Sequence, residues 1–303
     1  MRAAKNSDGQ DEEADPRVLR RYAKISMVDG HPWFFRMSGD RKDTGLIGYY
    51  GPDATKQGFM VAIDAPGYNK MSKRFALFTG VEDFYQSVVE HPPRAFSGDH
   101  YYEIVGATTP EQKPYFDIDI DPRKFPDDID AEFFACKMIW LIIAVVRDQI
   151  HTLIGVDSSS FRMSVYSTIY PKKVETGLPK KFSYHLVVQG VHFAGHEDMK
   201  RFGDLIKAEL LRMEEIRGDR LAIRASEAID VIWFKTRQFR LLGSSKLGST
   251  AVKIRINDIT LQPERIYTDA RSRLRVLTES CVSIIPSTSR LIKMPRLADE
   301  ESN

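Results

Sequence analysis

The sequence predicts an α+β protein built on an antiparallel or mixed β-sheet. Two features lead to this prediction. From residue 114 onward, strand-like and helix-like segments follow in the order β-α-β-β-α-β-β, which is typical of α+β folds. The strand-like segments alternate apolar and polar residues, whereas residues 129–154 and 196–216 carry apolar residues at helical spacing. At 303 residues, the chain is long enough for one large domain or two packed modules.

The predicted organisation has four parts. Residues 1–15 form a polar, acidic, disordered tail that is neither a secretory signal nor a mitochondrial presequence. An N-terminal α/β module over 16–110 precedes a C-terminal module over 111–290 and a flexible tail over 291–303. The predicted strands cover 73–80, 100–105, 113–122, 161–170, 182–190, 229–234 and 251–256, and the predicted helices cover 81–91, 129–154 and 196–216.

The composition restricts the class of protein. The formal net charge is only +2, so any basic surface that binds nucleic acid must be local. Cys136 and Cys281 are too few for a disulfide framework or a four-cysteine zinc site, and they suit a reducing, intracellular compartment. The longest apolar run, 133–146, is too short to span a membrane. We therefore expect an intracellular protein with no zinc and no membrane contact.

The stretch "KPYFDIDIDP" places Asp117, Asp119 and Asp121 at every second position. On a strand, this spacing puts the three carboxylates on one face, where they repel one another. The plain alternative is a half-exposed strand whose polar face is acidic. The flanking aromatic and β-branched residues favour a packed strand instead, in which divalent cations such as Mg²⁺ offset the charge. A pair of carboxylates two residues apart suits a two-metal site for phosphoryl transfer.

Two later segments carry the complementary groups. In "KKFSYHL", Lys181, Ser183 and His185 alternate on one strand face, which offers one charge and two directed hydrogen bonds to an anion such as a triphosphate. A lone histidine on a strand is more often structural. In "AIDVIWFKTRQFRLLGSSK", Asp230 lies in an apolar strand and basic residues follow it, although a solvated basic face has the same pattern. Together, the three segments contain the groups that nucleotidyl transfer needs.

These segments resemble the three-motif signature of archaeo-eukaryotic primases, in particular the PrimPol (primase-polymerase) branch. "KKFSYHLVV" resembles its Lys-x-Ser-x-His motif, and "RQFRLLGSSKLG" resembles its Arg-x-Phe-Arg-Leu-x-x-Ser-Ser-Lys segment. "HYYEIV…KPYFDIDID" and "KRFALFTGVEDFYQSV" resemble the first motif and the region before it, so the likeness covers roughly residues 70–260. The resemblance implies a primase catalytic core of two packed modules, with an RRM-like antiparallel or mixed sheet carrying the active site.

The resemblance also implies a DNA-directed primase-polymerase that transfers (d)NMP from (d)NTP to a 3′-hydroxyl on a single-stranded DNA template. Relatives that start primers commonly carry a C-terminal Cys/His zinc module. This chain has no such cluster, so we expect a minimal catalytic core. By position, the metal ligands for Mg²⁺ or Mn²⁺ would be Asp117, Asp119 and Asp230; the nucleotide-binding residues Lys181, Ser183, His185, Arg237, Gln238, Arg240, Lys246 and Tyr102; and the DNA-binding residues Lys73 and Arg74.

Several alternatives stay open. Tyr102 would lie near the sugar of the incoming nucleotide, or it is a core tyrosine with Tyr101 exposed; Asp121 is expected to be an outer-shell or surface residue. The chain could instead be a non-catalytic single-stranded nucleic-acid-binding module or a metal-dependent phosphodiesterase or nuclease. The expected partners are single-stranded or primed DNA, dNTPs or NTPs, and a helicase or single-strand-binding protein. The expected setting is DNA replication or damage tolerance, cellular or viral, in the nucleus or cytoplasm.

Overall fold

The computed structural model of the chain divides into two compact units. Unit 1 contains the residues up to Ile104 together with 238–240 and 246–248, and unit 2 contains the remainder. The structure describes residues 25–28, 31–38, 45–64, 73–90, 100–106, 111–125, 130–155, 160–168, 177, 179–217, 220–230, 236–246, 248–264 and 269–295. The predicted N-terminal tail over 1–15 lies outside these residues.

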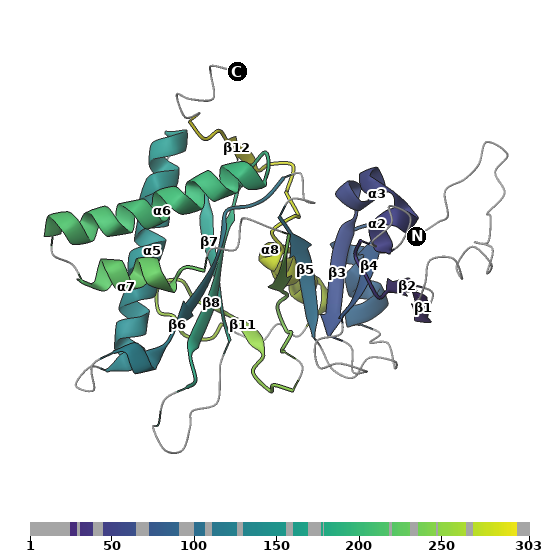
Figure 1. The fold of residues 1–303 in the computed structure, drawn as a ribbon, viewed down its shortest axis with the longest axis horizontal. Helices are drawn as coiled ribbons and strands as arrows, with labels where there is room; N and C mark the ends of the chain where they lie inside the picture. The colour runs from purple at the N-terminus through teal and green to yellow at the C-terminus, as the bar shows by residue number, and fades with distance from the viewer. Residues whose placement is uncertain are drawn as a thin grey trace. The chain divides into compact units, whose positions relative to one another are not determined.

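Unit 1 is organised around a six-stranded sheet in the order β1-β2-β4-β3-β5-β10 (Figure 1). Its helices include α2, which packs Leu46 into a core cluster with Phe34, Met60 and Ile104. A second group of aromatic rings, including Phe78 and Phe84, is also fully buried. The strands are β1 (Ile25–Val28), β2 (His31–Phe34), β3 (Phe59–Asp64), β4 (Lys73–Phe78), β5 (Tyr101–Val105) and β10 (Arg237–Arg240), and the helices are α2 (Leu46–Tyr50), α3 (Pro52–Gln57), α4 (Val81–Phe84) and the π-helix η1 (Tyr85–Val89).

Unit 2 is organised around a four-stranded antiparallel sheet in the order β11-β7-β8-β6. A short parallel pair, β9 with β12, lies beside it. Its strands are β6 (Tyr115–Ile120), β7 (Arg162–Thr168), β8 (Phe182–Gln189), β9 (Val191–Phe193), β11 (Lys253–Ile256) and β12 (Arg290–Ile292), and its helices are η2 (Pro122–Lys124), α5 (Ala131–Ile154), α6 (His196–Arg217), α7 (Arg220–Ala228) and α8 (Ala270–Ser280).

Helices cover the two faces of the four-stranded sheet unequally. Figure 1 shows α5, α6 and α7 on one side and α8 on the other. The apolar face carries Phe116, whose ring packs 6.0 Å from that of Phe202 on α6. Because side chains alternate along a strand, this packing turns Asp117 and Asp119 toward the opposite face.

Local signals explain where α5 begins and ends. The Asp130 carboxylate accepts hydrogen bonds from the backbone N–H groups of Glu132 and Phe133 at the first turn. At the other end, Gly155 adopts a left-handed conformation with φ of 62° and donates its N–H to the His151 carbonyl. The helix therefore closely follows the predicted span.

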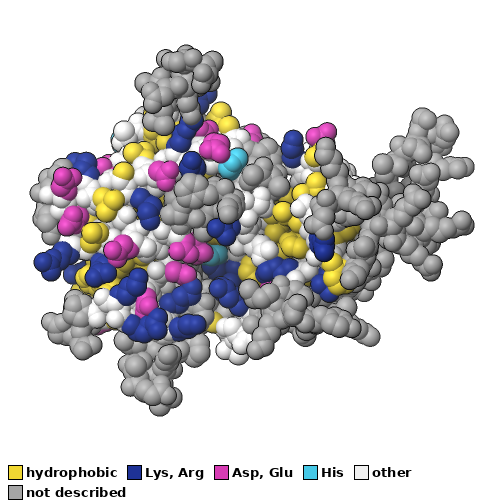
Figure 2. All heavy atoms as spheres, in the orientation of Figure 1, with side chains coloured by type: hydrophobic (Ala, Val, Ile, Leu, Met, Phe, Trp, Pro, Cys, Tyr) yellow, Lys and Arg dark blue, Asp and Glu magenta, His cyan; other side chains and the backbone are white. Residues whose placement is uncertain are grey.

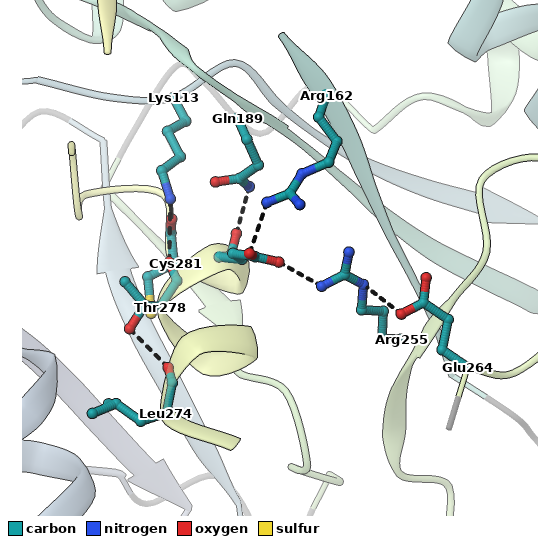
Figure 3. Close-up of polar contacts among 9 residues, drawn as sticks. Lys113, Arg162, Gln189, Arg255, Glu264, Leu274, Thr278 and Cys281 are labelled. Carbon is teal, nitrogen blue, oxygen red and sulfur yellow. Dashed lines mark hydrogen bonds and ion pairs between the residues drawn. The ribbon is translucent and has the colours of Figure 1, made fainter. Parts of the chain in front are cut away.

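On the other side of the sheet, α8 is held by a polar cluster (Figure 3). The Glu279 carboxylate accepts hydrogen bonds from Arg162 at 2.7 Å and Arg255 at 2.5 Å, and its backbone carbonyl accepts one from Gln189 at 2.6 Å. The buried ammonium of Lys113 donates to the Cys281 carbonyl at the end of the same helix. We call Glu279, Arg162, Arg255 and Gln189 the Glu279 cluster.

The α+β class predicted from the sequence is confirmed, with antiparallel sheets and helices. Most of the predicted strands and both long helices fall on observed elements. The sequence reasoning missed α7 and α8, and part of the predicted helix over 81–91 is the π-helix η1. The first two residues of the predicted C-terminal tail belong to β12, and residues 296–303 lie outside the described residues.

Candidate active site

Two rows of polar side chains cross the four-stranded sheet on a single face. Asp117 lies directly opposite His185 and Asp119 directly opposite Ser183 in the pairing of β6 with β8. Both rows continue through β7 to β11. Directly paired residues of antiparallel strands share a face. The first row is Asp117–His185–Tyr166–Arg255, and the second is Asp119–Ser183–Thr168–Lys253.

Each carboxylate of β6 has a basic partner on β8 or immediately before it. His185 is buried, with 4% of its surface exposed, and its Nε2 lies 3.4 Å from Asp117 Oδ1. Lys181 Nζ donates a hydrogen bond to Asp119 Oδ2. The expectation that His185 is buried beside one of the two aspartates is therefore confirmed, while its role in binding a nucleotide stays a prediction.

Backbone contacts hold the third predicted ligand, Asp230, at the edge of β6. Ile229 forms an isolated antiparallel bridge with Ile118, and the Asp230 N–H donates to the Asp117 carbonyl at 2.9 Å. The Asp230 side chain is exposed. The strand predicted over 229–234 is described only at its first two residues, since 231–235 lie outside the described residues.

Burial and neighbouring charges raise the pKa of two of the three aspartates, Asp117 and Asp230. Burial raises the pKa of Asp117 to about 6; the Lys253 and Lys181 charges oppose this rise, and those of Asp119 and Asp230 add to it. Burial also raises the pKa of Asp230, and the Asp119 charge contributes in the same direction. The site therefore concentrates negative charge that a bound cation would stabilise.

The carboxylates offer the hard oxygen ligands that Mg²⁺ and Mn²⁺ prefer. Asp119 Oδ1 is buried and makes no hydrogen bond within the described part of the chain, so this oxygen is available to coordinate a cation. Among the described residues, however, no group of three or more His, Cys, Asp or Glu side chains is arranged to hold a metal ion. The donor set fits the predicted metal, and the assignment itself stays a prediction.

Lys253 is a site residue that the sequence reasoning missed. It lies on β11 at the end of the second row, is 1% exposed, and lowers the pKa of Asp117 by its charge. The signal was available in "AVKIRI", where Lys253 and Arg255 alternate with apolar residues. The same period-two spacing that marked the aspartates marks these two basic residues.

Asp121 has a local structural role. Its carboxylate caps the short helix η2 by accepting a hydrogen bond from the Arg123 backbone N–H at 3.0 Å. It also accepts two hydrogen bonds from the Arg123 guanidinium, at 2.8 and 2.6 Å, and these bonds hold the pKa of Asp121 below its usual range. Asp121 is thus engaged by its neighbour in sequence, unlike the other two aspartates of "DIDID".

Tyr102 is packed within unit 1. It is 7% exposed, and its hydroxyl donates to Asp64 Oδ2 at 2.8 Å. Lys73 Nζ lies 3.6 Å from the centre of the Tyr102 ring and pairs with Asp64 Oδ1 at 2.5 Å. Tyr101 is also buried, at 3% exposed, so the alternative in which Tyr101 is exposed is wrong on that point.

Other predicted contact residues also lie in unit 1. The Arg74 guanidinium stacks 3.4 Å from the centre of the Phe35 ring. Burial lowers the pKa of Lys73, and the charges of Lys246 and Arg240 lower it further, which places these three basic residues in one electrostatic neighbourhood.

The remaining predicted nucleotide-binding residues differ in exposure. Arg240 is buried, whereas Gln238 and Lys246 are exposed. Arg237 belongs to unit 2, where its charge lowers the pKa of Asp230.

Figure 2 shows Lys and Arg side chains gathered with a few acidic ones over the part of unit 2 where β6, β8 and α7 lie in Figure 1.

Comparison with protein-family models and with curated proteins found no match to this chain. Within the described residues, every helix is too short or too polar to pass through a bilayer.

Proposed function

We propose that the chain is a DNA-directed primase-polymerase that transfers (d)NMP from (d)NTP to a 3′-hydroxyl on a single-stranded DNA template. One observation carries the proposal. Asp117 and Asp119 lie in register with His185 and Ser183 on the paired strand β8, so a carboxylate pair and a row of groups suited to bind phosphate share one face. The antiparallel sheet, with helices on its apolar face, supports the same assignment.

In this function, Asp117, Asp119 and Asp230 would hold two Mg²⁺ or Mn²⁺ ions. When bound, the ions would activate the attacking 3′-hydroxyl and stabilise the leaving pyrophosphate. The role of the chain is to hold the carboxylate oxygens that would bind the ions. Two of these ligands lie on a paired strand, and the third is tied to that strand by the hydrogen bond from the Asp230 N–H.

The row on β8 would bind and orient the triphosphate. Ser183 and His185 are buried and can donate directed hydrogen bonds to phosphate oxygens, and Lys181 adds a positive charge beside Asp119. Lys253 adds a second, buried charge to the same face. A triphosphate held in this way would present its α-phosphate to the 3′-hydroxyl, forming the new O–P bond as the bond to pyrophosphate breaks.

The residues of unit 1 would contact DNA and nucleotide by the same reasoning. Lys73, Arg240 and Lys246 form a basic neighbourhood in which Asp64 is the carboxylate paired with Lys73, and this composition supports binding of an anion. Arg74, held by its stacking on Phe35, would contact the template backbone. Template binding, replication or damage-tolerant synthesis, and a helicase or single-strand-binding partner all belong to this proposal.

The test is an extension assay with a primed template, dNTPs, and Mg²⁺ or Mn²⁺. We expect wild type and Asp121→Ala to extend the primer and Asp117→Ala to fail, because only Asp117 belongs to the carboxylate pair. Degradation of the primer would identify a nuclease or phosphodiesterase. Template binding without extension under any metal would identify a binding module, and either result would reject the polymerase.

A further inference from the structure

Lys207 on α6 binds the end of α7 immediately before Asp230. Its ammonium donates hydrogen bonds to the Ser226 carbonyl at 2.7 Å and the Ile229 carbonyl at 3.0 Å. Carbonyls at the end of a helix have no partner within the helix and carry partial negative charge. Lys207 therefore satisfies one such group in the last turn of α7, binds the Ile229 carbonyl just beyond the helix, and ties the end of α7 to α6.

The segment that Lys207 holds leads directly into the candidate site. Helix α7 ends at Ala228, Ile229 bridges to Ile118 on β6, and the Asp230 N–H donates to Asp117. The three residues from 228 to 230 are thus fixed from two sides, by Lys207 on one and by β6 on the other. A shift of α7 would move the Asp230 backbone relative to Asp117.

The Asp230 side chain depends on this backbone support. It is exposed, whereas the backbone N–H of the same residue is held by the Asp117 carbonyl. Asp119, by contrast, is held through its side chain by Lys181. The position of the third carboxylate is therefore set by the segment that carries it.

The charges that face Lys207 suit a structural cation. Burial lowers its pKa, whereas the carboxylates of Asp230, Asp204 and Glu227 favour its charged form. Lys207 is half-buried, so its stem packs while its ammonium reaches the two carbonyls.

We propose that Lys207 is a positioning residue that holds Asp230 in place as the third metal ligand. The proposal rests on the function proposed above. Lys207 itself would touch neither metal nor nucleotide; it would act through the carbonyls of Ser226 and Ile229. Groups that orient metal ligands commonly change metal affinity or activity by about 10-fold to 100-fold when they are removed.

The test compares Lys207→Met, Lys207→Arg and the control Lys200→Met, which lies on the same helix. Mn²⁺ binding is measured by electron paramagnetic resonance without DNA or nucleotide, and kcat and KM for dNTP by primer extension. We expect Lys207→Met to weaken Mn²⁺ binding about 10-fold to 100-fold and to lower kcat, with KM unchanged because the phosphate row on β8 is intact. Lys207→Arg should restore part of both losses, and Lys200→Met should match wild type.

Hydrogen exchange supplies a readout independent of metal. Lys207→Met should speed amide exchange in the peptide covering 226–230, and Lys200→Met should not. If Lys207→Met melts at a lower temperature, each measurement is repeated on Lys207→Gln, whose side-chain amide can still donate a hydrogen bond. Wild-type Mn²⁺ binding by Lys207→Met would overturn the proposal. A lower melting temperature in both, with KM and kcat changed together, would assign Lys207 to stability alone and would also overturn it.

A parallel measurement on Asp230→Ala separates this proposal from the one on which it rests. If Asp230→Ala binds Mn²⁺ as wild type does, the metal assignment itself is wrong. If Asp230→Ala loses Mn²⁺ and Lys207→Met does not, only the positioning role fails.

Discussion

The Glu279 carboxylate and the carboxylate pair of Asp117 and Asp119 lie beside the same face of the four-stranded sheet, and their surroundings differ. In the Glu279 cluster, each carboxylate oxygen of Glu279 accepts a hydrogen bond from an arginine, one from Arg162 and one from Arg255. At the candidate site, Asp119 keeps a buried oxygen with no hydrogen-bond partner among the described residues. Burial also raises the pKa of the neighbouring Asp117 to about 6.

This difference distinguishes a carboxylate with a structural role from carboxylates that can still coordinate a cation. Glu279 joins α8 to β7 and β11, and its bonding capacity is used within the chain. The aspartates lie next to one another and are only partly compensated by Lys181, His185 and Lys253. Clustered acids in which burial and neighbouring charges raise a pKa, as they do for Asp117 and Asp230, are typical of functional sites.

The largest effect should come from Asp119→Asn. We expect primer extension to fall at least about a thousandfold, because losing a metal ligand removes several kcal/mol of transition-state stabilisation. Thermal stability should stay near that of wild type, since the Lys181 partner is partly solvated. Steady-state extension and a thermal melt check this, and near-wild-type extension would remove Asp119 from the metal site.

Glu279→Gln should show the opposite behaviour. Losing the charge of Glu279 removes the counter-charge of Arg162, which is largely exposed, while Arg255 keeps its ion pair with Glu264 at 2.9 Å, so we expect a loss of roughly 1–3 kcal/mol. Chemical denaturation measures the loss, and extension per folded molecule should stay close to wild type. A variant that is stable but inactive would place Glu279 in the active site and break the comparison.

The pH dependence of stability sharpens the contrast. In metal-free protein, the pKa of Asp117 is about 6, above its ordinary value of 3.8, so between these values the folded chain binds protons more tightly than the unfolded chain. The free energy of unfolding should therefore fall as pH rises through this window, by on the order of 3 kcal/mol. Asp117→Asn should lack this contribution. Denaturation with EDTA across the window measures it, and equal slopes for both proteins would contradict the raised pKa.

A smaller effect is expected from Ser183, which lies directly opposite Asp119 on β8. Ser183→Ala should raise KM for dNTP about tenfold, because a hydrogen bond to a charged group contributes roughly 1.5–3 kcal/mol. Metal binding should be unchanged, since Ser183 offers no carboxylate. Single-nucleotide insertion and Mn²⁺ titration separate the two quantities. An unchanged KM would mean that Ser183 does not bind the triphosphate.

Asp121→Ala should have the smallest effect. It removes the cap of η2 and the pairing with Arg123, at a cost of about 1 kcal/mol or less, and leaves extension intact. Because Asp121 follows Asp117 and Asp119 on the same segment, it is a matched control for them. Loss of extension in this variant would extend the acidic site beyond the two paired aspartates.

The elements that the sequence did not predict are those that depend on contacts. Helix α7 has only nine residues, too few to be stable alone, and it is held by α6 and β6. Helix α8 carries several charged residues, and its attachment rests on Glu279 and on Lys113, whose partners are distant in the sequence. Such contacts join residues of different elements, so they cannot be read from the pattern of either helix alone.

The sequence by itself determined which residues share a face. Alternation along a strand follows from backbone geometry, so "DIDID" and "KFSYH" placed Asp117 with Asp119, and Ser183 with His185. Only the tertiary structure decided that these two faces meet, in a register that sets Asp117 against His185 and extends both rows to Lys253 and Arg255. Strand neighbours and register arise from packing between segments far apart in the chain, which no local pattern specifies.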